Sequence, residues 1–413
     1  MNRKTAAHKE TNVPQLRFEE FNDNWEQRKF SDLYVPLAER NSDLLPYNKT
    51  LSAATMTYKT DGNGAADSSL ANYKRLRIGD IAFEGHTSKT FRYGRFVLND
   101  TGDGIMSPRF SALRPLTQMP TNFWKYYIHY EPIMRKVLVA STKAGTMMNE
   151  LVTDEFLKSY VLVPSIEEQT HIGGILKNID HLITLHQHKY ERLKTLKQAM
   201  LQKMFPREGK LVPEIRFEGF TEAWEQRKVS EVAEICAGGT PSTGIVRYWY
   251  PKEIPWVSSG EVHKKYITFT DNKISIEGMN NSSARMIPEN SVLIALAGQG
   301  KTRGTVAINR IPLTTNQSIA AMTFSNEIVP EFVFSNLENR YEEIRRMSSG
   351  DGSRGGLNKQ IVGDIEIPYT SKEEQDKIGE CFNNLDHLIT LHQRKYEKLL
   401  ECKKAFLTKM FPG

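Results

Sequence analysis

Residues 178–187 read NIDHLITLHQ and residues 384–393 read NLDHLITLHQ, so two distant stretches of one chain differ at a single position. The two copies share further short blocks at matching places: KYE at 189–191 and 395–397, KMFP at 203–206 and 409–412, RFE at 17–19 and 216–218, and WEQRK at 25–29 and 224–228. The chain is therefore a repeat of two units, each of roughly 200 residues. The segments between the shared blocks diverge. A duplicated frame with diverged inserts predicts one task performed on two different targets.

The composition is that of a globular protein. The 413 residues are 39% hydrophobic and 25% charged, and no apolar run is long enough to cross a membrane. We expect the polar residues 1–13 to be a frayed tail rather than a signal peptide. The three cysteines form no CxxC motif, which favours reduced thiols in the cytoplasm over disulfides or a zinc site. The net charge of +6 mildly favours an anionic partner.

Residues 167–204 and 373–410 are predicted to be long helices. Each opens with acidic residues, continues with heptad-like apolar spacing and ends before a proline, Pro206 or Pro412. Gly173, Gly174 and Gly379 are expected to kink the first turns. An antiparallel pairing of the two helices would bury both apolar stripes and relate the two units by a pseudo-two-fold axis. The alternative is a pair of ordinary core helices in two separate domains.

Matching polar residues on the two helices predict a face that a repeated partner would contact. These partner-docking candidates are His181, His186, Lys189, His387, His392 and Lys395. A metal site is the alternative for the histidines, but their spacing does not resemble that of a zinc protease. We therefore predict no bound metal.

The inserts at 30–163 and 229–367 differ in composition from the predicted helices. They carry many Gly, Asn, Ser and Thr residues around short apolar runs. Strands are predicted near 78–83, 96–98, 291–296 and 305–308. Helices are predicted at 122–139 and 330–347. The expected fold class is α+β, with two mixed domains and two long antiparallel helices of coiled-coil type.

Both inserts contain a glycine-framed loop between two strands, GHTSKTFRYG at 85–94 and GQGKTRG at 298–304. A second loop follows in each, MSPRF at 106–110 and TNQSI at 315–319. Arg is the residue type that contacts guanine, Asn and Gln contact adenine, and Lys and Thr contact phosphate. The DNA-binding candidates are Lys89, Thr90, Arg92, Tyr93, Arg109, Arg247, Tyr248, Lys301, Thr302, Arg303, Asn316 and Gln317. The alternative is a set of ordinary solvated surface side chains.

The segment ALAGQGKT at 295–302 fits a permissive nucleotide-binding pattern. A P-loop feeds a helix whose N-terminus holds phosphate, whereas the residues that follow here have the pattern of a strand. We therefore disfavour a P-loop protein. The sequence also lacks GxSxG, HExxH and a nuclease-like carboxylate cluster, so we predict no catalytic residue in this chain.

Along its whole length the chain resembles the specificity (S) subunit of type I restriction-modification systems. The resemblance rests on the order of variable and repeated segments and on local motifs: GGTPS at 238–242, IPWVSSG at 254–260, EEQ at 167–169 and 373–375, and the Phe-Pro pairs that close both helices. It implies a tail at 1–13, a first target-recognition domain at 14–163, a helix at 164–206, a second recognition domain at 207–367 and a second helix at 368–413.

The resemblance also implies a non-catalytic, cytoplasmic subunit that recognises a bipartite, asymmetric site in double-stranded DNA. It would dock two methyltransferase (M) and two restriction (R) subunits, with no membrane association. This chain would bind no cofactor; S-adenosylmethionine, ATP and Mg²⁺ would belong to the partners. A DNA-binding scaffold outside restriction is an alternative, as is a coiled-coil scaffold that binds no nucleic acid.

Overall fold

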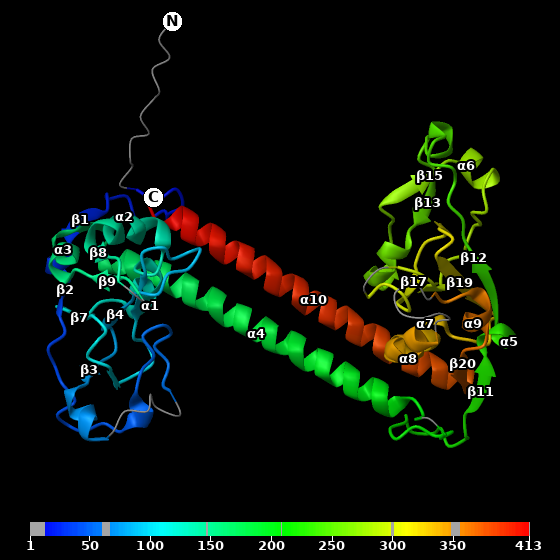
Figure 1. Cartoon of the computed structure of the whole chain (residues 1–413), viewed down its shortest axis with the longest axis horizontal. Coiled ribbons are helices and arrows are strands. Elements are labelled where there is room, and N and C mark those ends of the chain that lie inside the picture. The colour runs from blue at the N-terminus through cyan, green and yellow to red at the C-terminus, as the bar shows by residue number, and fades with distance from the viewer. Residues whose placement is uncertain are drawn as a thin grey trace, which may run out of the picture. The chain divides into compact units, whose positions relative to one another are not determined.

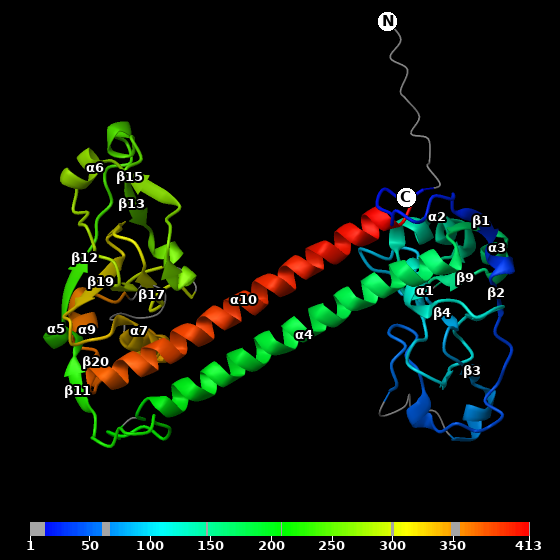
Figure 2. The same ribbon diagram turned by 180° about the vertical axis from the view of Figure 1, so that it is seen from behind.

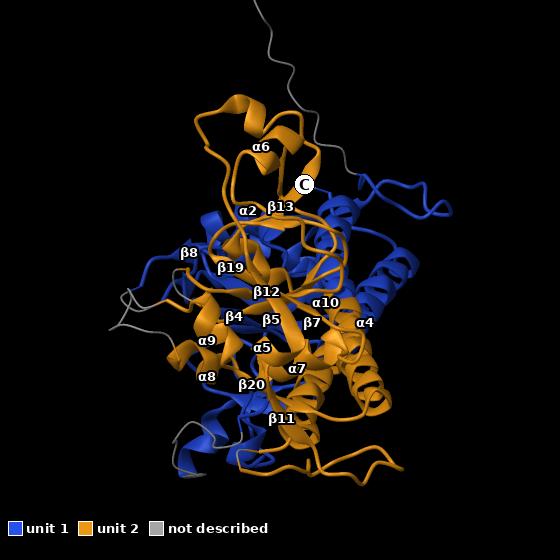
Figure 3. Ribbon diagram, turned by 90° about the vertical axis from the view of Figure 1, so that its right-hand side faces the viewer, with its two compact units in different colours: residues 1–187, 394–413 blue, residues 188–393 orange. Residues whose placement is uncertain are grey.

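A computed structural model describes residues 13–59, 67–145, 148–207, 209–298, 301–347 and 356–412 of the chain. The chain divides into two compact units, Met1–Gln187 with Arg394–Gly413, and His188–Gln393 (Figure 3). We call them unit 1 and unit 2. Each unit holds one insert and part of both long helices. The domain boundaries predicted at 163/164, 206/207 and 367/368 stay predictions. The expected tail at 1–13 lies outside the described residues, apart from Val13.

The two long helices are α4 (Ile166–Met204) and α10 (Lys372–Met410), each of 39 residues, as the periodicity predicted. A serine precedes each helix and accepts a backbone hydrogen bond from its first turn. Ser165 Oγ accepts from Glu168 N at 3.2 Å, and Ser371 Oγ accepts from Glu374 N at 3.4 Å. These serines satisfy backbone donors that the first turn of a helix leaves unpaired.

An antiparallel pairing of α4 with α10 occurs within each unit (Figure 1). In unit 1, Asp180 of α4 pairs with Lys403 of α10 at 2.7 Å. In unit 2, Lys197 of α4 pairs with Asp386 of α10 at 2.6 Å. Asp180 and Asp386 are equivalent repeat positions, as are Lys197 and Lys403, so the same ion pair forms twice with the helices exchanged. The predicted antiparallel pairing of the helices is therefore confirmed within each unit.

The ion pair in unit 2 belongs to a buried network. Lys197 Nζ also lies 2.6 Å from Glu338 Oε2, and Tyr266 Oη donates to Asp386 Oδ2 at 3.0 Å. Burial opposes the ionisation of Glu338, but the Lys197 and Lys265 ammonium groups outweigh it and hold the pKa of Glu338 below its usual range. The network therefore ties the second insert to both long helices.

The expected kinks at the helix glycines are wrong, because both helices run unbroken through them. A Cβ at Gly173 would lie 2.6 Å from Phe123 N, and one at Gly379 would lie 3.2 Å from Phe332 N. The missing side chains thus let the starts of α1 (Thr121–Tyr127) and α7 (Pro330–Asn339) press onto the long helices. The glycines serve close approach rather than bending.

Gly173→Ala should destabilise the protein by about 1–3 kcal/mol, because its new methyl group would overlap backbone atoms of α1. Gly174→Ala is the matched control, since a Cβ there meets nothing within 4 Å. That control should be neutral or stabilise by up to about 1 kcal/mol, the usual advantage of Ala over Gly inside a helix. Chemical denaturation of both variants measures the difference, and equal effects would contradict the packing role of Gly173.

Unit 1 contains a main sheet of strand order β2-β7-β4-β5 and smaller strand pairs. Its strands are β1 (Glu26–Lys29), β2 (Tyr34–Pro36), β3 (Lys74–Leu76), β4 (Ile81–Glu84), β5 (Arg95–Leu98), β6 (Gly104–Met106), β7 (Ala112–Pro115), β8 (Thr142–Lys143), β9 (Glu150–Leu151) and β10 (Tyr160–Val163). Helices α1, α2 (Glu131–Ser141) and α3 (Thr153–Lys158) cover it. The single helix predicted at 122–139 is divided into α1 and α2, because Pro132 favours the first turn of a new helix.

Unit 2 contains a five-stranded sheet of order β12-β19-β16-β17-β14 and a smaller sheet, β15-β13-β18. Figure 2 labels β12, β19 and β17 of the first sheet and β13 and β15 of the second. Its strands are β11 (Glu225–Lys228), β12 (Ala233–Ala237), β13 (Ile254–Val257), β14 (Tyr266–Ile267), β15 (Asn272–Ile274), β16 (Val292–Ala295), β17 (Val306–Asn309), β18 (Thr314–Thr315), β19 (Ile319–Phe324) and β20 (Glu366–Tyr369). Its helices besides α7 are α5 (Val229–Val232), α6 (Ile276–Asn280), α8 (Tyr341–Arg346) and α9 (Lys359–Gly363). The helix predicted at 330–347 is thus two helices, α7 and α8.

The two inserts share a strand order, since β2-β7-β4-β5 corresponds to β12-β19-β16-β17. The loop at 85–94 joins β4 to β5, and the loop at 298–304 joins β16 to β17. The second loop of each insert likewise precedes the corresponding strand, β7 or β19. The predicted equivalence of the loops and the α+β fold class are therefore confirmed.

The repeated blocks outside the helices form a common frame. The two EQRK segments are β1 and β11, which pair antiparallel with β10 and β20, the strands that lead into the long helices. The arginine of each RFE block binds the second glutamate of an EEQ block through two hydrogen bonds, Arg17 to Glu168 and Arg216 to Glu374. In both copies these blocks therefore fasten the insert to its long helix.

Candidate nucleic-acid interface

Side chains of the β4–β5 loop line three different pockets or grooves of unit 1. His86 lines a groove with Arg109, Thr90 lines a second groove with Tyr126 and Asp180, and Arg92 lines a pocket against α2. Lys89, Thr90 and Arg92 are exposed. The loop therefore offers basic and polar groups over a broad surface rather than one convergent site.

The groove at Arg109 brings together three segments that are far apart in the sequence. It has a volume of about 350 Å³ and is lined by residues 50–54, Lys59, Glu84, His86, Ser107, Arg109 and Phe110. We call it the Arg109 groove. The guanidinium of Arg109 lies 4.7 Å from the centre of the Phe110 ring. The Arg109 side chain lines the groove and is exposed. Exposed cations beside an open polar groove suit contact with a nucleic acid.

A half-buried lysine supports the loop that carries Arg109. Lys74 Nζ donates a hydrogen bond to the backbone oxygen of Phe110 at 2.7 Å. Burial, and then the nearby Arg40 charge, lower the pKa of Lys74 below its usual range. Lys74 therefore holds the backbone next to Arg109 through this hydrogen bond, while the Arg109 side chain is exposed.

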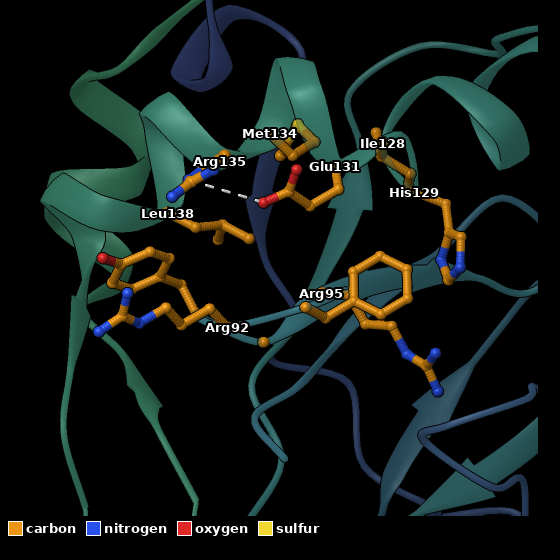
Figure 4. Close-up of a pocket in the computed structure, with 11 residues that line it drawn as sticks. Arg92, Arg95, Ile128, His129, Glu131, Met134, Arg135 and Leu138 are labelled. Atoms are coloured by element: carbon orange, nitrogen blue, oxygen red, sulfur yellow. Dashed lines mark ion pairs between the residues drawn. The ribbon is translucent and has the colours of Figure 1, made fainter. Parts of the chain in front are cut away.

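Arg92 and Tyr93 line a pocket beside α2 and do not line the Arg109 groove. Figure 4 shows Arg92 in this pocket. Their pocket is lined by Met134, Arg135 and Leu138 on one side and by His129 on the other. Burial lowers the pKa of His129, although a hydrogen bond between its Nδ1 and Phe96 O at 3.1 Å acts in the opposite direction. The structure thus places Arg92 apart from Arg109, although the sequence grouped them.

In the second insert, the GGTPS motif is packed against the second loop. A Cβ at Gly238 would lie 2.1 Å from Thr315 O, so only glycine allows this approach. Thr240 Oγ1 donates to Gln317 Oε1 at 2.6 Å, which joins the motif to an exposed candidate side chain. The Asn316 side-chain oxygen accepts from Ser318 N at 3.2 Å and therefore stabilises its own turn. Gln317 is the better placed of these two candidates for contact with a ligand.

The loop with Lys301, Thr302 and Arg303 leads into β17, not into a helix. The P-loop interpretation therefore fails among the described residues of 295–302; residues 299 and 300 lie outside them. Lys301 is exposed, and its backbone oxygen accepts a hydrogen bond from Tyr341 Oη at 2.8 Å. Helix α8 thus holds this loop while its lysine side chain remains on the surface.

Arg247 and Tyr248 lie beside α6. Arg247 pairs with Glu277 at 2.7 Å on the surface, and the partly buried Tyr248 accepts a backbone bond from Ser275 N. Trp256 connects this region to the GGTPS motif by donating from Nε1 to Gly239 O at 3.0 Å. The candidates of the second insert therefore occupy neighbouring but distinct segments.

The partner-docking candidates lie on the surfaces of the long helices. His181, Lys189, His387 and Lys395 are exposed, whereas His186 and His392 are half-buried. Equivalent leucines accompany them: Leu182 and Leu185 in unit 1, and Leu388 and Leu391 in unit 2, each at least 36% exposed. Exposed leucines at matching positions give each helix an apolar surface next to the predicted polar face.

Sequence reasoning missed three polar residues at these sites: Lys59, His86 and Thr240. His86 carried a usable signal, because Glu84 precedes it by two residues and ends an otherwise apolar strand. Lys59 had no recognisable signal in the sequence, because only the folded structure brings it into the same groove as Arg109. Within the described ranges, no group of His, Cys, Asp and Glu is arranged to hold a metal ion, and no helix is long and apolar enough to cross a membrane.

Comparison with known proteins agrees with this duplicated architecture. Residues 221–401 match the family described as "Type I restriction modification DNA specificity domain". The chain is thus similar to type I specificity subunits, through this domain match and through the relatives below. The match covers the second insert and most of α10. The first half of the chain lies outside this match, but it carries the same repeated blocks.

Individual relatives extend the likeness. The MjaIX specificity subunit of Methanocaldococcus jannaschii is 29% identical over 182 residues, which are 43% of this chain and 41% of that protein. The putative MjaX specificity subunit of the same organism is 22% identical over 98% of this chain and 97% of its own length. The alignments with MjaIX and with the Escherichia coli EcoR124I/EcoR124II subunit span less than half of those relatives, 41% and 46%.

A solved structure shows the same fold. The crystal structure of the type I S subunit from M. genitalium superposes with a TM-score of 0.62 at 16% identity, covering 97% of this chain and 99% of that one. The fold class predicted from the repeat is therefore confirmed by a solved structure that covers nearly the whole chain.

Proposed function

We propose that this chain is the DNA-recognition subunit of a type I restriction-modification complex and recognises a bipartite site. The observation that carries the proposal is the duplication itself: one frame and one strand order occur twice, while the loops at equivalent places differ in sequence. A shared frame predicts the same kind of ligand, and different loops predict different sequences. Each insert would therefore contact one half of an asymmetric site in double-stranded DNA.

Partner subunits would dock on the long helices. The exposed face with His181, Leu182, Leu185 and Lys189, and its equivalent around Leu388, offer the same chemistry twice. Two copies of one partner fit such a repeat, as the family resemblance implies for methyltransferase subunits. Two restriction subunits would join them in the complete complex, which would act on chromosomal DNA in the cytoplasm.

The chemistry would belong to those partners. We assign no catalytic residue and no cofactor to this chain; S-adenosylmethionine would be bound by the methyltransferase subunits, and ATP with Mg²⁺ by the restriction subunits. The chain's own contribution is the position of the DNA, through base contacts that specify and phosphate contacts that orient.

Methylome sequencing of cells carrying the intact system tests this function. We expect a methylated motif of two short specified blocks separated by a few unspecified pairs, with the blocks about 10 bp apart, centre to centre, for two domains on one face of a duplex. Cells that lack this chain but keep the partner subunits should lose the methylation. A continuous palindromic motif, or methylation that persists without the chain, would contradict the proposal.

A further inference from the structure

Glu84 is a buried carboxylate at the end of β4, and it holds the side chain of His86. Only 5% of Glu84 is exposed. Its Oε1 accepts a hydrogen bond from His86 N at 3.0 Å and lies 2.5 Å from His86 Nδ1. Its Oε2 lies 3.7 Å from Arg95 Nε, on the neighbouring strand β5. A carboxylate is costly to bury without partners, so this pairing defines the position of His86.

The pairing also decides which atom His86 presents to the Arg109 groove. An ionised carboxylate can only accept, so Nδ1 carries the hydrogen of this contact. The uncharged imidazole then has no hydrogen on Nε2, which is an acceptor. The side chain of His86 is 59% exposed and lines the groove with Ser107 and Arg109. In its uncharged form, His86 therefore gives the groove an oriented acceptor beside the cationic groups of Lys59 and Arg109.

We propose that His86 determines base preference in one half-site, with Nε2 accepting a hydrogen bond from an exocyclic amino group, and that Glu84 is its positioning residue. In the major groove, adenine N6 and cytosine N4 carry the amino groups that such an acceptor distinguishes from guanine and thymine. Arg109 and Lys59 stand beside it as donors to other base edges or phosphates. This inference rests on the proposed DNA-recognition function.

Selection from a randomised duplex library tests the inference, with the full chain in complex with its methyltransferase subunits. His86→Ala should lose about tenfold of the preference for adenine or cytosine at one position of one block. Thr87→Ala is the control, because Thr87 is the exposed neighbour in the same loop and should leave the motif unchanged. Glu84→Gln should weaken the preference at that same position. Melting temperatures of His86→Ala and Thr87→Ala should match that of the unaltered chain, because both side chains are exposed.

A base analogue then tests the assigned atom. At the relaxed position, purine in place of adenine, or 2-pyrimidinone in place of cytosine, removes the amino group. This change should weaken the unaltered chain about tenfold and should not weaken His86→Ala further. An unchanged motif in His86→Ala, a relaxed position that prefers guanine or thymine, or an equal loss in both blocks would overturn the inference. If the unaltered chain selected no motif, the proposed function itself would fail.

Discussion

Replacing residues 229–365 with the matching segment of another specificity subunit should change one block of the methylated motif and leave the other block intact. The exchanged segment contains α5, the five-stranded sheet and both candidate loops of the second insert. It leaves β11, β20 and the long helices in place, so the frame that fastens the insert is preserved. Base contacts specify sequence, and in this design all contacts of one half-site change at once.

The reciprocal exchange of residues 30–159 is the matched control, because it leaves β1 and β10 in place and should alter only the other block. Methylome sequencing of both chimaeras measures the outcome. The spacer should stay the same in both, since neither chimaera changes α4 or α10. A chimaera that altered both blocks, or neither, would contradict the assignment of one insert to one half-site.

The frame was predictable because its signals are local and occur twice. Heptad-like spacing, acidic first turns and terminal prolines located α4 and α10 to within one residue at their starts. Near-identity of the two helices then suggested their pairing, and the equivalent Asp180–Lys403 and Asp386–Lys197 contacts agree with it. The comparison of the two copies within one chain was therefore enough to predict the two helices and their pairing.

The site was less predictable because its geometry depends on tertiary contacts. The sequence grouped Arg92 with Arg109, but a loop of a few residues can direct successive side chains to different faces, and here Arg92 faces α2. Lys59 reaches the Arg109 groove from a distant segment. The kinks expected at Gly173 and Gly379 were wrong for the same reason, since only the packed structure shows what lies against a glycine. The assignment of individual residues to bases or phosphates stays a prediction.

Glu374→Ala should be among the most destabilising single substitutions in the frame, at about 3–5 kcal/mol. Glu374 is fully buried and accepts hydrogen bonds from Arg216 at 2.6 and 2.8 Å, from Trp224 Nε1 at 2.9 Å and from Thr370 Oγ1 at 2.5 Å. Its removal leaves a largely buried guanidinium without its counter-ion, and breaking such a pair typically costs this much. Denaturant unfolding of the full chain at pH 7 measures the loss.

Glu168→Ala is the matched variant in the first copy and should cost less. Glu168 accepts the same two bonds from Arg17, at 2.8 and 2.7 Å, but the indole Nε1 of Trp25 finds no partner within the described part of the chain. Pro164 stands where the second copy has Thr370, so a hydroxyl donor is also missing. With two fewer donors, the difference between the variants should be about 1–3 kcal/mol, the usual value of one or two bonds to a charged group. An equal or larger loss in Glu168→Ala would contradict this explanation.

Acid should weaken the same contact in the unaltered chain. Burial opposes the ionisation of Glu374, but hydrogen bonds from Arg216 and Thr370 outweigh it and lower its pKa. A carboxyl whose pKa is lower in the folded state stabilises the fold above its unfolded-state pKa, about 4.3, and loses that contribution as pH falls through the folded value. Glu374→Gln has no such titration, so its unfolding free energy should fall less steeply below about pH 4.5 than that of the unaltered chain. Parallel slopes in denaturant titrations from pH 6 to pH 3 would show that Glu374 does not carry this acid sensitivity.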